Sequence, residues 1–347
     1  MVLALAVLVA APNARAAYDP VGSGTTKLVL DQRFSLFLAA NRIEVRTVAG
    51  ARRSGSVFAL PISSGRVDPR SGKGEVEQEG SLVLANARKR VPIRDLVVKT
   101  AHTPLVGKVG GSQLKLATAS SLRFRRRGFG AIVSAKPLRL TAKVATRLNK
   151  KLRPAAPFVA GQAIGKLISA PQPSLTAILV QGRASLALDA AFKAKLDQRF
   201  VSVNPISPAE LAPGPTLTFP ILGGALAPDL SSGLLKLGGS IELLQLGAGQ
   251  IFWAELEPDL DGALLSAEAD LEPSPPFAGR QGPAPLLAAG SGTLSADPSR
   301  RTLTAAGIPL TLEAATADSL NAAFDAGGSA FEAGETVGAL SFTAQGQ

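Results

Sequence analysis

The sequence contains the same succession of short motifs twice, and this duplication constrains the fold more than any other feature. Five motif pairs occur in the same order in both halves: 28–34 with 186–192, 58–62 with 217–221, 80–82 with 239–241, 148–149 with 320–321, and 158–165 with 331–338. Pro61 and Pro220 are 159 residues apart, whereas Gly161 and Gly334 are 173 residues apart. A constant offset with one increase indicates two homologous units, the second carrying an insertion of about a dozen residues.

The duplication also sets the domain boundaries. The chain has 347 residues, which suits two domains of ordinary size. We predict an N-terminal linker at 17–24, a first domain at 25–170, a linker at 171–174 and a second domain at 175–347. The insertion falls in a stretch rich in Pro and Gly at 273–285, which predicts a surface loop.

Composition and periodicity favour β structure. Gly and Pro are abundant (35 and 25 residues), which is typical of many short strands joined by turns. Alternating strands are predicted at 81–84, 93–98, 113–116 and 340–343, and short helices near 28–38, 186–196, 145–152 and 315–324, although the start of each opening helix could equally be strand. We therefore predict a mostly β protein with two tandem antiparallel β-sandwich-like domains, each with one or two short helices.

The N-terminus has the pattern of an export signal. An apolar run at 2–11 precedes Pro12 and the sequence Ala14-Arg15-Ala16, which predicts a signal peptide at 1–16. The run is too short to span a bilayer, and the alternative is a buried N-terminal strand or helix. No Lys or Arg precedes it, a departure from the usual pattern. We expect the protein to be secreted or held at the cell surface.

Three groups of motif residues point to a known family. The groups are Asp31 and Phe34 with Asp189 and Phe192; then Pro61, Ile62, Gly65, Asp68, Pro69, Gly72, Gly74, Gly80 and Ser81; and then Leu320, Asn321, Phe331, Ala333, Gly334 and Gly338. In this pattern both units resemble the HtaA domain family of actinobacterial secreted and cell-surface proteins, which often occurs in tandem and includes haem-binding members. The resemblance covers essentially the whole chain after the signal peptide.

The resemblance implies where haem ligands would stand in each unit, but the residues at those positions are not haem ligands. In haem-binding relatives a Tyr follows the opening-helix Phe by three residues, and a His lies within the strand that begins Gly-Ser. The matching positions here are Phe37 and Lys195 for the Tyr, and Ala87 and Leu246 for the His. None is a good iron ligand, so no cofactor is expected, with haem or another apolar ligand kept as the alternative. Tyr18 and His102, each the only residue of its type, lie in predicted linker and loop segments.

Charge separates the two units. Residues 1–173 contain 29 Lys and Arg against 8 Asp and Glu, whereas residues 174–347 contain 8 against 18. Such asymmetry indicates charged partners. Candidate anion-binding residues are Arg88, Lys89, Arg90, Arg123, Arg125, Arg126 and Arg127, with further cations at 52–53 and 150–153. The expected partners are an anionic wall polymer, glycan or lipid surface, or the acidic domain of a second copy; too few aromatic residues interleave with these cations to predict nucleic acid. A simple solvated basic face is the alternative.

No residue pattern indicates catalysis or metal binding. The chain has no Cys, which excludes disulfides and thiolate sites, and its single His supports no nucleophile–base pair. Glu255, Glu257, Asp259 and Asp261 could offer calcium oxygen ligands, but they lack the glycine turn of a calcium loop, and a solvated strand end is the preferred interpretation. The sequence therefore predicts a non-enzymatic binding protein without catalytic residues or a metal.

Overall fold

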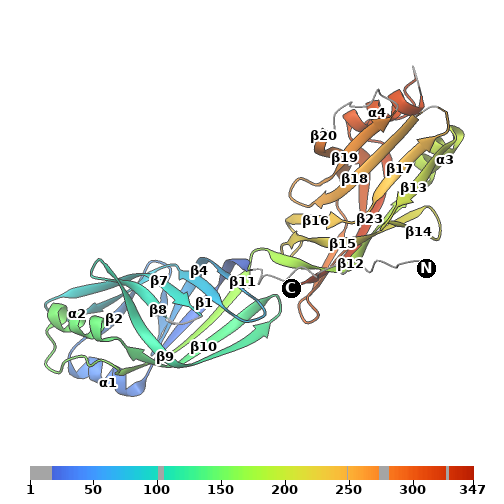
Figure 1. Cartoon of the computed structure of the whole chain (residues 1–347). Helices are drawn as coiled ribbons and strands as arrows, with labels where there is room; N and C mark the ends of the chain where they lie inside the picture. The colour runs from blue at the N-terminus through green and yellow to red at the C-terminus, as the bar shows by residue number, and fades with distance from the viewer. Residues whose placement is uncertain (1–17, 101–104, 248, 273–280, 326–327) are drawn as a thin grey trace, which may run out of the picture.

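A computed structural model describes residues 18–100, 105–247, 249–272, 281–325 and 328–347. The predicted signal peptide and His102 lie outside the described residues, as does most of the predicted insertion loop. The chain forms two elongated β domains joined end to end (Figure 1). None of the helices in the described part of the chain is long and apolar enough to cross a membrane.

The two domains share one order of elements. Domain 1 contains β1 (Asp19–Leu30), α1 (Gln32–Ala40), β2 (Glu44–Val48), β3 (Arg52–Ser54), β4 (Val57–Val67), β5 (Gly74–Gln78), β6 (Ser81–Ala85), β7 (Arg90–Lys99), β8 (Leu105–Val109), β9 (Ser112–Arg127), β10 (Gly130–Leu140), α2 (Ala142–Leu152) and β11 (Ala163–Pro173). Domain 2 contains β12 (Thr176–Leu188), α3 (Ala190–Gln198), β13 (Val201–Ile206), β14 (Glu210–Ala212), β15 (Thr216–Leu226), β16 (Gly233–Leu237), β17 (Ser240–Gln245), β18 (Gly249–Asp259), β19 (Leu264–Glu272), β20 (Gln281–Ala289), β21 (Thr293–Asp297), β22 (Thr302–Leu312), α4 (Ala314–Phe324) and β23 (Thr336–Gly346).

Strand pairing repeats from one domain to the other. In domain 1 the order β7-β5-β4-β1-β11-β10-β9-β8 returns to β7 through the β7–β8 pairing, which closes a ring of eight antiparallel strands. In domain 2 the order β18-β16-β15-β12-β23-β22-β20-β19 closes in the same way through β18–β19. The mostly β, tandem architecture with short helices is thus confirmed. Each domain uses one continuous sheet, so the two layers expected of a sandwich are opposite walls of one ring.

The motifs that revealed the duplication have structural roles. Asp31 and Asp189 cap α1 and α3, because their side chains accept hydrogen bonds from the first backbone N–H groups of each helix. The side chain of Asn149 both donates to and accepts from the backbone of Phe158, at 2.9 and 2.7 Å, and Asn321 does the same with Phe331, at 2.8 and 2.9 Å. Each Asn thereby fixes the segment that leads into the last strand of its domain.

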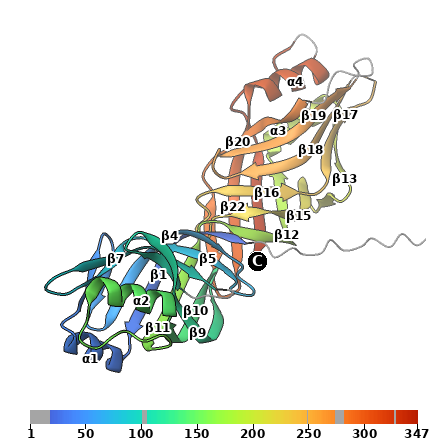
Figure 2. The same cartoon turned by 60° about the vertical axis from the view of Figure 1, so that its left-hand side comes forward.

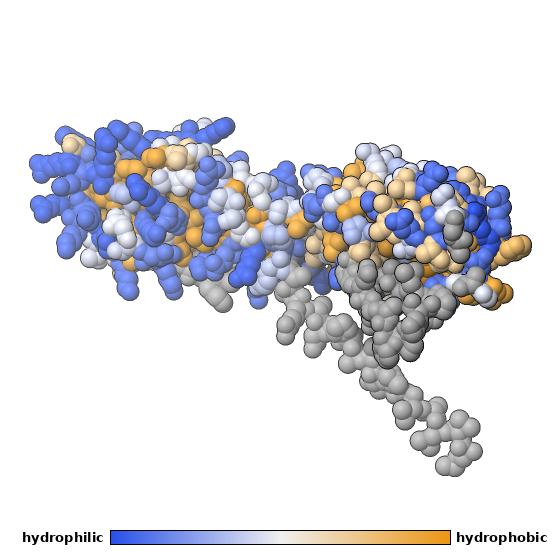
Figure 3. Space-filling model, turned by 90° about the horizontal axis from the view of Figure 1, so that it is seen from above, coloured by the Kyte–Doolittle hydropathy of each residue, from blue (hydrophilic) through white to orange (hydrophobic). Residues whose placement is uncertain are grey.

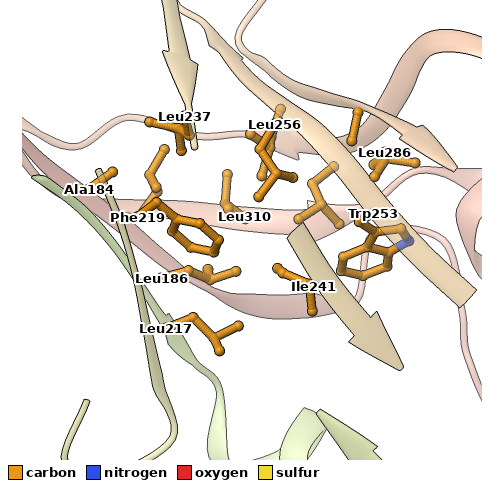
Figure 4. Packing of buried hydrophobic residues seen from close by; sticks show 14 of the residues in the cluster. Ala184, Leu186, Leu217, Phe219, Leu237, Ile241, Trp253, Leu256, Leu286 and Leu310 are labelled. Atoms are coloured by element: carbon orange, nitrogen blue, oxygen red, sulfur yellow. The ribbon is translucent and has the colours of Figure 1, made fainter. Parts of the chain in front are cut away.

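Each domain has its own apolar core inside the ring. The core of domain 1 includes Phe58, Leu138 and Leu167, and that of domain 2 includes Phe219, Trp253 and Leu186 (Figure 4). The helices lie at the two ends of the molecule that are remote from the junction, as two views show (Figures 1 and 2). The strand ends opposite the helices meet at the junction.

Both predicted linkers are corrected by the structure. Residues 19–24 belong to β1 and residues 171–173 to β11, so that only Ser174 and Leu175 separate β11 from β12. Gly and Pro in these stretches suggested loops, but Val21 pairs with Pro173. Gly24 has a φ of +127°, and a Cβ there would lie 2.2 Å from the carbonyl oxygen of Ala170. This glycine therefore permits close strand pairing rather than marking a loop.

Two smaller expectations also change. Leu28 and Leu186 lie near the ends of strands β1 and β12, the alternative left open for the start of each opening helix, and the helices themselves begin only after Asp31 and Asp189. The last part of the predicted insertion loop is strand, since β20 starts at Gln281.

Candidate functional site

The structure divides the predicted anion-binding residues among separate surfaces. Arg123, Arg125 and Arg127 alternate along β9 and are exposed on the outer face of the ring. Arg126 points to the other side, where its Nε donates a hydrogen bond to the carbonyl oxygen of Pro69 at 2.9 Å. A run of cations in the sequence therefore contributes to two faces, because successive strand residues alternate in direction.

One cross-strand row connects six neighbouring strands of domain 1 through directly paired residues. In order from β9 to β3, the row consists of Arg123, Ser134, Ile168, Lys27, Ala59 and Arg52. On β1, Thr26 and Leu28 flank Lys27 and are both buried, so Lys27 points outward. The row thus brings together cations that are far apart in the sequence.

Further cations on the same strands extend this row into a surface. We define the cationic strand face by the exposed residues Lys27, Arg52, Arg123, Arg125, Arg127, Lys136 and Lys166. Among the described residues, none of these seven side chains forms an ion pair. The only carboxylate on β1, β3, β4, β9, β10 and β11 is the buried Asp19. Lys27, Lys136 and Lys166 were missed from the sequence because they are isolated there; only their alternation with buried neighbours marks them.

The basic segment at 88–90 lies elsewhere, at the helical end of domain 1. Arg88 and Lys89 form the exposed β6–β7 turn, and Arg90 begins β7. Asn86 holds this turn against α2, since its Nδ2 donates to the carbonyl oxygen of Leu152 at 2.8 Å. We call this region, with Lys143, Arg147, Lys150 and Lys151 of α2, the helical pole.

The surface of domain 2 lacks the cations of the row. Glu210, Thr218, Ser185 and Ser341 form the corresponding row across β14, β15, β12 and β23. Ser134 of domain 1 corresponds to Ala306 of domain 2, 172 residues later. Ala306 pairs with Thr293, so Thr293 occupies in domain 2 the place that Arg123 occupies in domain 1. Seen from above in Figure 3, domain 1, on the left, has a mostly hydrophilic surface, whereas domain 2 shows broader apolar areas.

The four positions matched to haem ligands do not fit haem iron. Phe37 packs on Phe34 and Phe158, with ring centroids 6.0 and 5.1 Å apart. Lys195 Nζ lies 2.6 Å from Glu335 Oε1 and 6.0 Å from the ring of Phe331. Ala87 and Leu246 are exposed in the turns that follow β6 and β17. Three of these side chains have no ligand atom, and the ammonium of Lys195 is held in an ion pair.

The acidic group of domain 2 makes local contacts. Glu257 pairs with Lys236 at 3.1 Å, Asp259 accepts from the backbone N–H of Asp261, and Asp261 accepts from that of Gly233. Glu255 is exposed on the same strand, β18. These contacts connect the ends of β16 and β18.

Two buried charged residues lie where the domains meet. Asp19 is 3% exposed and accepts hydrogen bonds from Thr176 Oγ1 at 3.1 Å and from the backbone N–H of Ala177 at 3.0 Å; burial raises its pKa above the ordinary value. Arg301 is 7% exposed, and its pKa is lowered to about 10 by burial and by the neighbouring Arg126. The first strand of domain 1 is thus attached directly to the first strand of domain 2.

These features define a tandem pair of closed antiparallel β domains that differ in charge. No family model and no curated protein matches the chain. Among solved structures, the C-terminal domain of HtaA from Corynebacterium glutamicum is similar at 15% identity and a TM-score of 0.38, over 48% of this chain and 98% of that domain. The N-terminal domain of the same protein is similar at 14% identity and a TM-score of 0.37, over 49% and 99%. Both are domains of the family that the sequence motifs resemble; at these values the likeness assigns neither ligand nor function to this chain.

Proposed function

We propose that this chain is a non-catalytic binding protein of the cell surface or extracellular space, which holds an extended anionic polymer on the cationic strand face. The observation that carries the proposal is the row from Arg123 through Lys27 to Arg52. The polymer class is an anionic wall polymer or an acidic glycan. The predicted signal peptide is consistent with such a partner, because these polymers lie outside the cell.

The length of the row favours a polymer over a small anion. Neighbouring strands are about 4.8 Å apart, so the five intervals from β9 to β3 cover roughly 24 Å along the curved wall of the ring. Lys27 lies three strands from Arg123 and two from Arg52. A single carboxylate or phosphate cannot reach all three cations, whereas a polymer with repeated charges can lie along the row.

Domain 2 supplies an internal comparison. It has the same fold, yet Glu210 and Ser185 occupy the places of Arg52 and Lys27. The fold therefore does not require cations in this row, and their presence in domain 1 needs another reason. Binding of a polyanion is that reason.

Exposed cations make the expected binding dependent on salt. In physiological salt the Debye length is about 8 Å, so each exposed cation attracts only the anionic groups close to it. Strong binding therefore requires many cations to contact the polymer at the same time. Arginine contributes directional hydrogen bonds to phosphate, sulfate or carboxylate groups, because its planar guanidinium donates two in parallel.

The test replaces the row residues of domain 1 by those of domain 2. In the variant Lys27→Ser, Arg52→Glu, Arg123→Thr, we expect elution from heparin and from immobilised wall polymer at clearly lower salt than the wild type. The control Arg88→Glu, Lys89→Ser, Arg90→Ser makes the same change in net charge at the helical pole and should elute close to the wild type. Equal shifts for both variants, or no retention of the wild type, would show that the strand face is not the binding site.

Self-association is a separate outcome of the same experiment. If the cationic strand face binds the acidic domain of a second copy, the wild type sediments as oligomers at low salt without polymer, and the row variant does not. That result would replace the polymer by a second copy as the partner.

A further inference from the structure

A groove of about 860 Å³ lies where domain 1 meets domain 2. Domain 1 provides its floor from the outer faces of β1, β10 and β11, and domain 2 provides one side through the β15–β16 and β21–β22 turns. The residues that carry the argument are Lys27, Arg127, Ile132, Ile168, Asp229 and Pro298. A volume of this size at a domain junction is typical of sites for small molecules.

The floor of the groove is apolar where a solvent-facing strand surface is normally polar. Ile132 and Ile168 alternate with buried neighbours on β10 and β11, so both point away from the core. At the duplicated positions, domain 2 has Thr304 and Ser341. The fold therefore does not need isoleucine at either place, which indicates a contact outside the core.

Cations stand beside this apolar floor. Lys27 and Arg127 line the groove and are exposed. Asp229 lines the groove from domain 2, and its carboxylate accepts hydrogen bonds from the side chain and backbone of Ser231, which lower its pKa. Two cations against one carboxylate leave a net positive groove with an apolar floor.

The walls of the groove are fixed by the junction. Phe129, at the β9–β10 turn of domain 1, is 5% exposed and belongs to the apolar core cluster of domain 2. At the neighbouring Gly128, a Cβ would lie 3.2 Å from Pro298 Cβ, so the two turns are in close approach. The two sides of the groove therefore have a defined separation.

We propose that the junction groove binds a single-chain anionic amphiphile. Its apolar chain lies on Ile132 and Ile168, and its carboxylate, phosphate or sulfate headgroup lies at Lys27 and Arg127. This site shares Lys27 and Arg127 with the cationic strand face but does not depend on polymer binding.

Calorimetric titration with dodecyl phosphate, kept below its micelle concentration, tests the site. The wild type should bind one equivalent, and the double variant Ile132→Thr, Ile168→Ser should bind at least tenfold more weakly. The double variant keeps all seven cations of the cationic strand face, so it should still elute from heparin at higher salt than the row variant. Inorganic phosphate and decyl maltoside, which lack the chain and the charge respectively, should bind much more weakly than dodecyl phosphate. Equal binding by the double variant, or by the neutral amphiphile, would overturn the proposal.

A second measurement needs no variant. A nitroxide-labelled fatty acid should attenuate the methyl signals of Ile132 and Ile168 in the wild type and leave those of Leu246, which is 88% exposed in domain 2, unchanged. Equal attenuation of Leu246 would mean non-specific adsorption. A wild type that binds dodecyl phosphate but is not retained on heparin would refute the polymer proposal alone.

Discussion

At the residue scale, the motifs that indicate the duplication stabilise the fold and do not act on a ligand. Asn149 and Asn321 fix the backbone of Phe158 and Phe331, and Asp31 and Asp189 cap helices. The residues with potential for binding lie between the motifs. They could be named from the sequence by type, but the direction of each side chain could not, as Arg126 shows.

Asp19 gives a prediction on pH. Burial raises the pKa of the Asp19 carboxyl, so the folded protein keeps the carboxyl proton at pH values where the unfolded chain has lost it. The contribution of Asp19 to stability therefore falls as the pH rises from about 4 through the raised pKa. Asp19→Asn keeps one acceptor oxygen for the backbone N–H of Ala177, places an amide N–H₂ beside Thr176 Oγ1, which can accept from it, and carries no charge. Its free energy of unfolding, relative to the wild type, should increase between about pH 4 and neutrality, as measured by urea titrations.

Asp95→Asn, at an exposed site that pairs with Lys108 at 2.7 Å, is the control and should lack this increase. A difference between Asp19→Asn and the wild type that is constant with pH would contradict the assignment.

At the element scale, periodicity located the strands but not their neighbours. The alternation in 81–84, 93–98 and 113–116 correctly predicted parts of β6, β7 and β9. The cationic row additionally requires the register between strands as distant as β3 and β11, and a shift of one residue would turn Lys27 inward. Only packing of the whole ring fixes that register.

Helix α2 gives a second prediction. No acidic residue lies in its first turn, and Lys143 is four residues before Arg147, so the two like charges face each other near the positive end of the helix dipole. Lys143→Glu reverses both effects and should stabilise the protein by about 0.5–1 kcal/mol in urea unfolding. Lys150→Glu, in the last turn, places a negative charge at the negative end of the dipole and should not stabilise. A loss of stability in Lys143→Glu would argue against repulsion between Lys143 and Arg147.

At the scale of the whole molecule, the two domains are connected by more than Ser174 and Leu175. Phe129 of domain 1 is inserted into the base of domain 2 and lies against Gly346. Asp19 joins β1 to the start of β12.

Removal of the Phe129 ring should uncouple the domains. A buried Phe→Ala replacement costs about 3–5 kcal/mol, and here the loss falls on the junction. We expect calorimetry of Phe129→Ala to resolve two unfolding transitions where the wild type has one, and X-ray scattering to show a wider range of molecular dimensions. Phe200→Ala, at an 86% exposed position, should behave as the wild type. A single unchanged transition for Phe129→Ala would mean that the domains are coupled through other contacts.

The sequence by itself determined the duplication, the β class and the separation of charge, because each can be recognised from residues that are close together in the chain. Tertiary structure alone decided that Arg52, Lys27 and Arg123 lie in one row, that Arg126 leaves it, and that Ile132 and Ile168 floor a groove between domains. The physical reason is that strand alternation sets only two faces, whereas ring closure, register and the docking of two domains set which faces become neighbours.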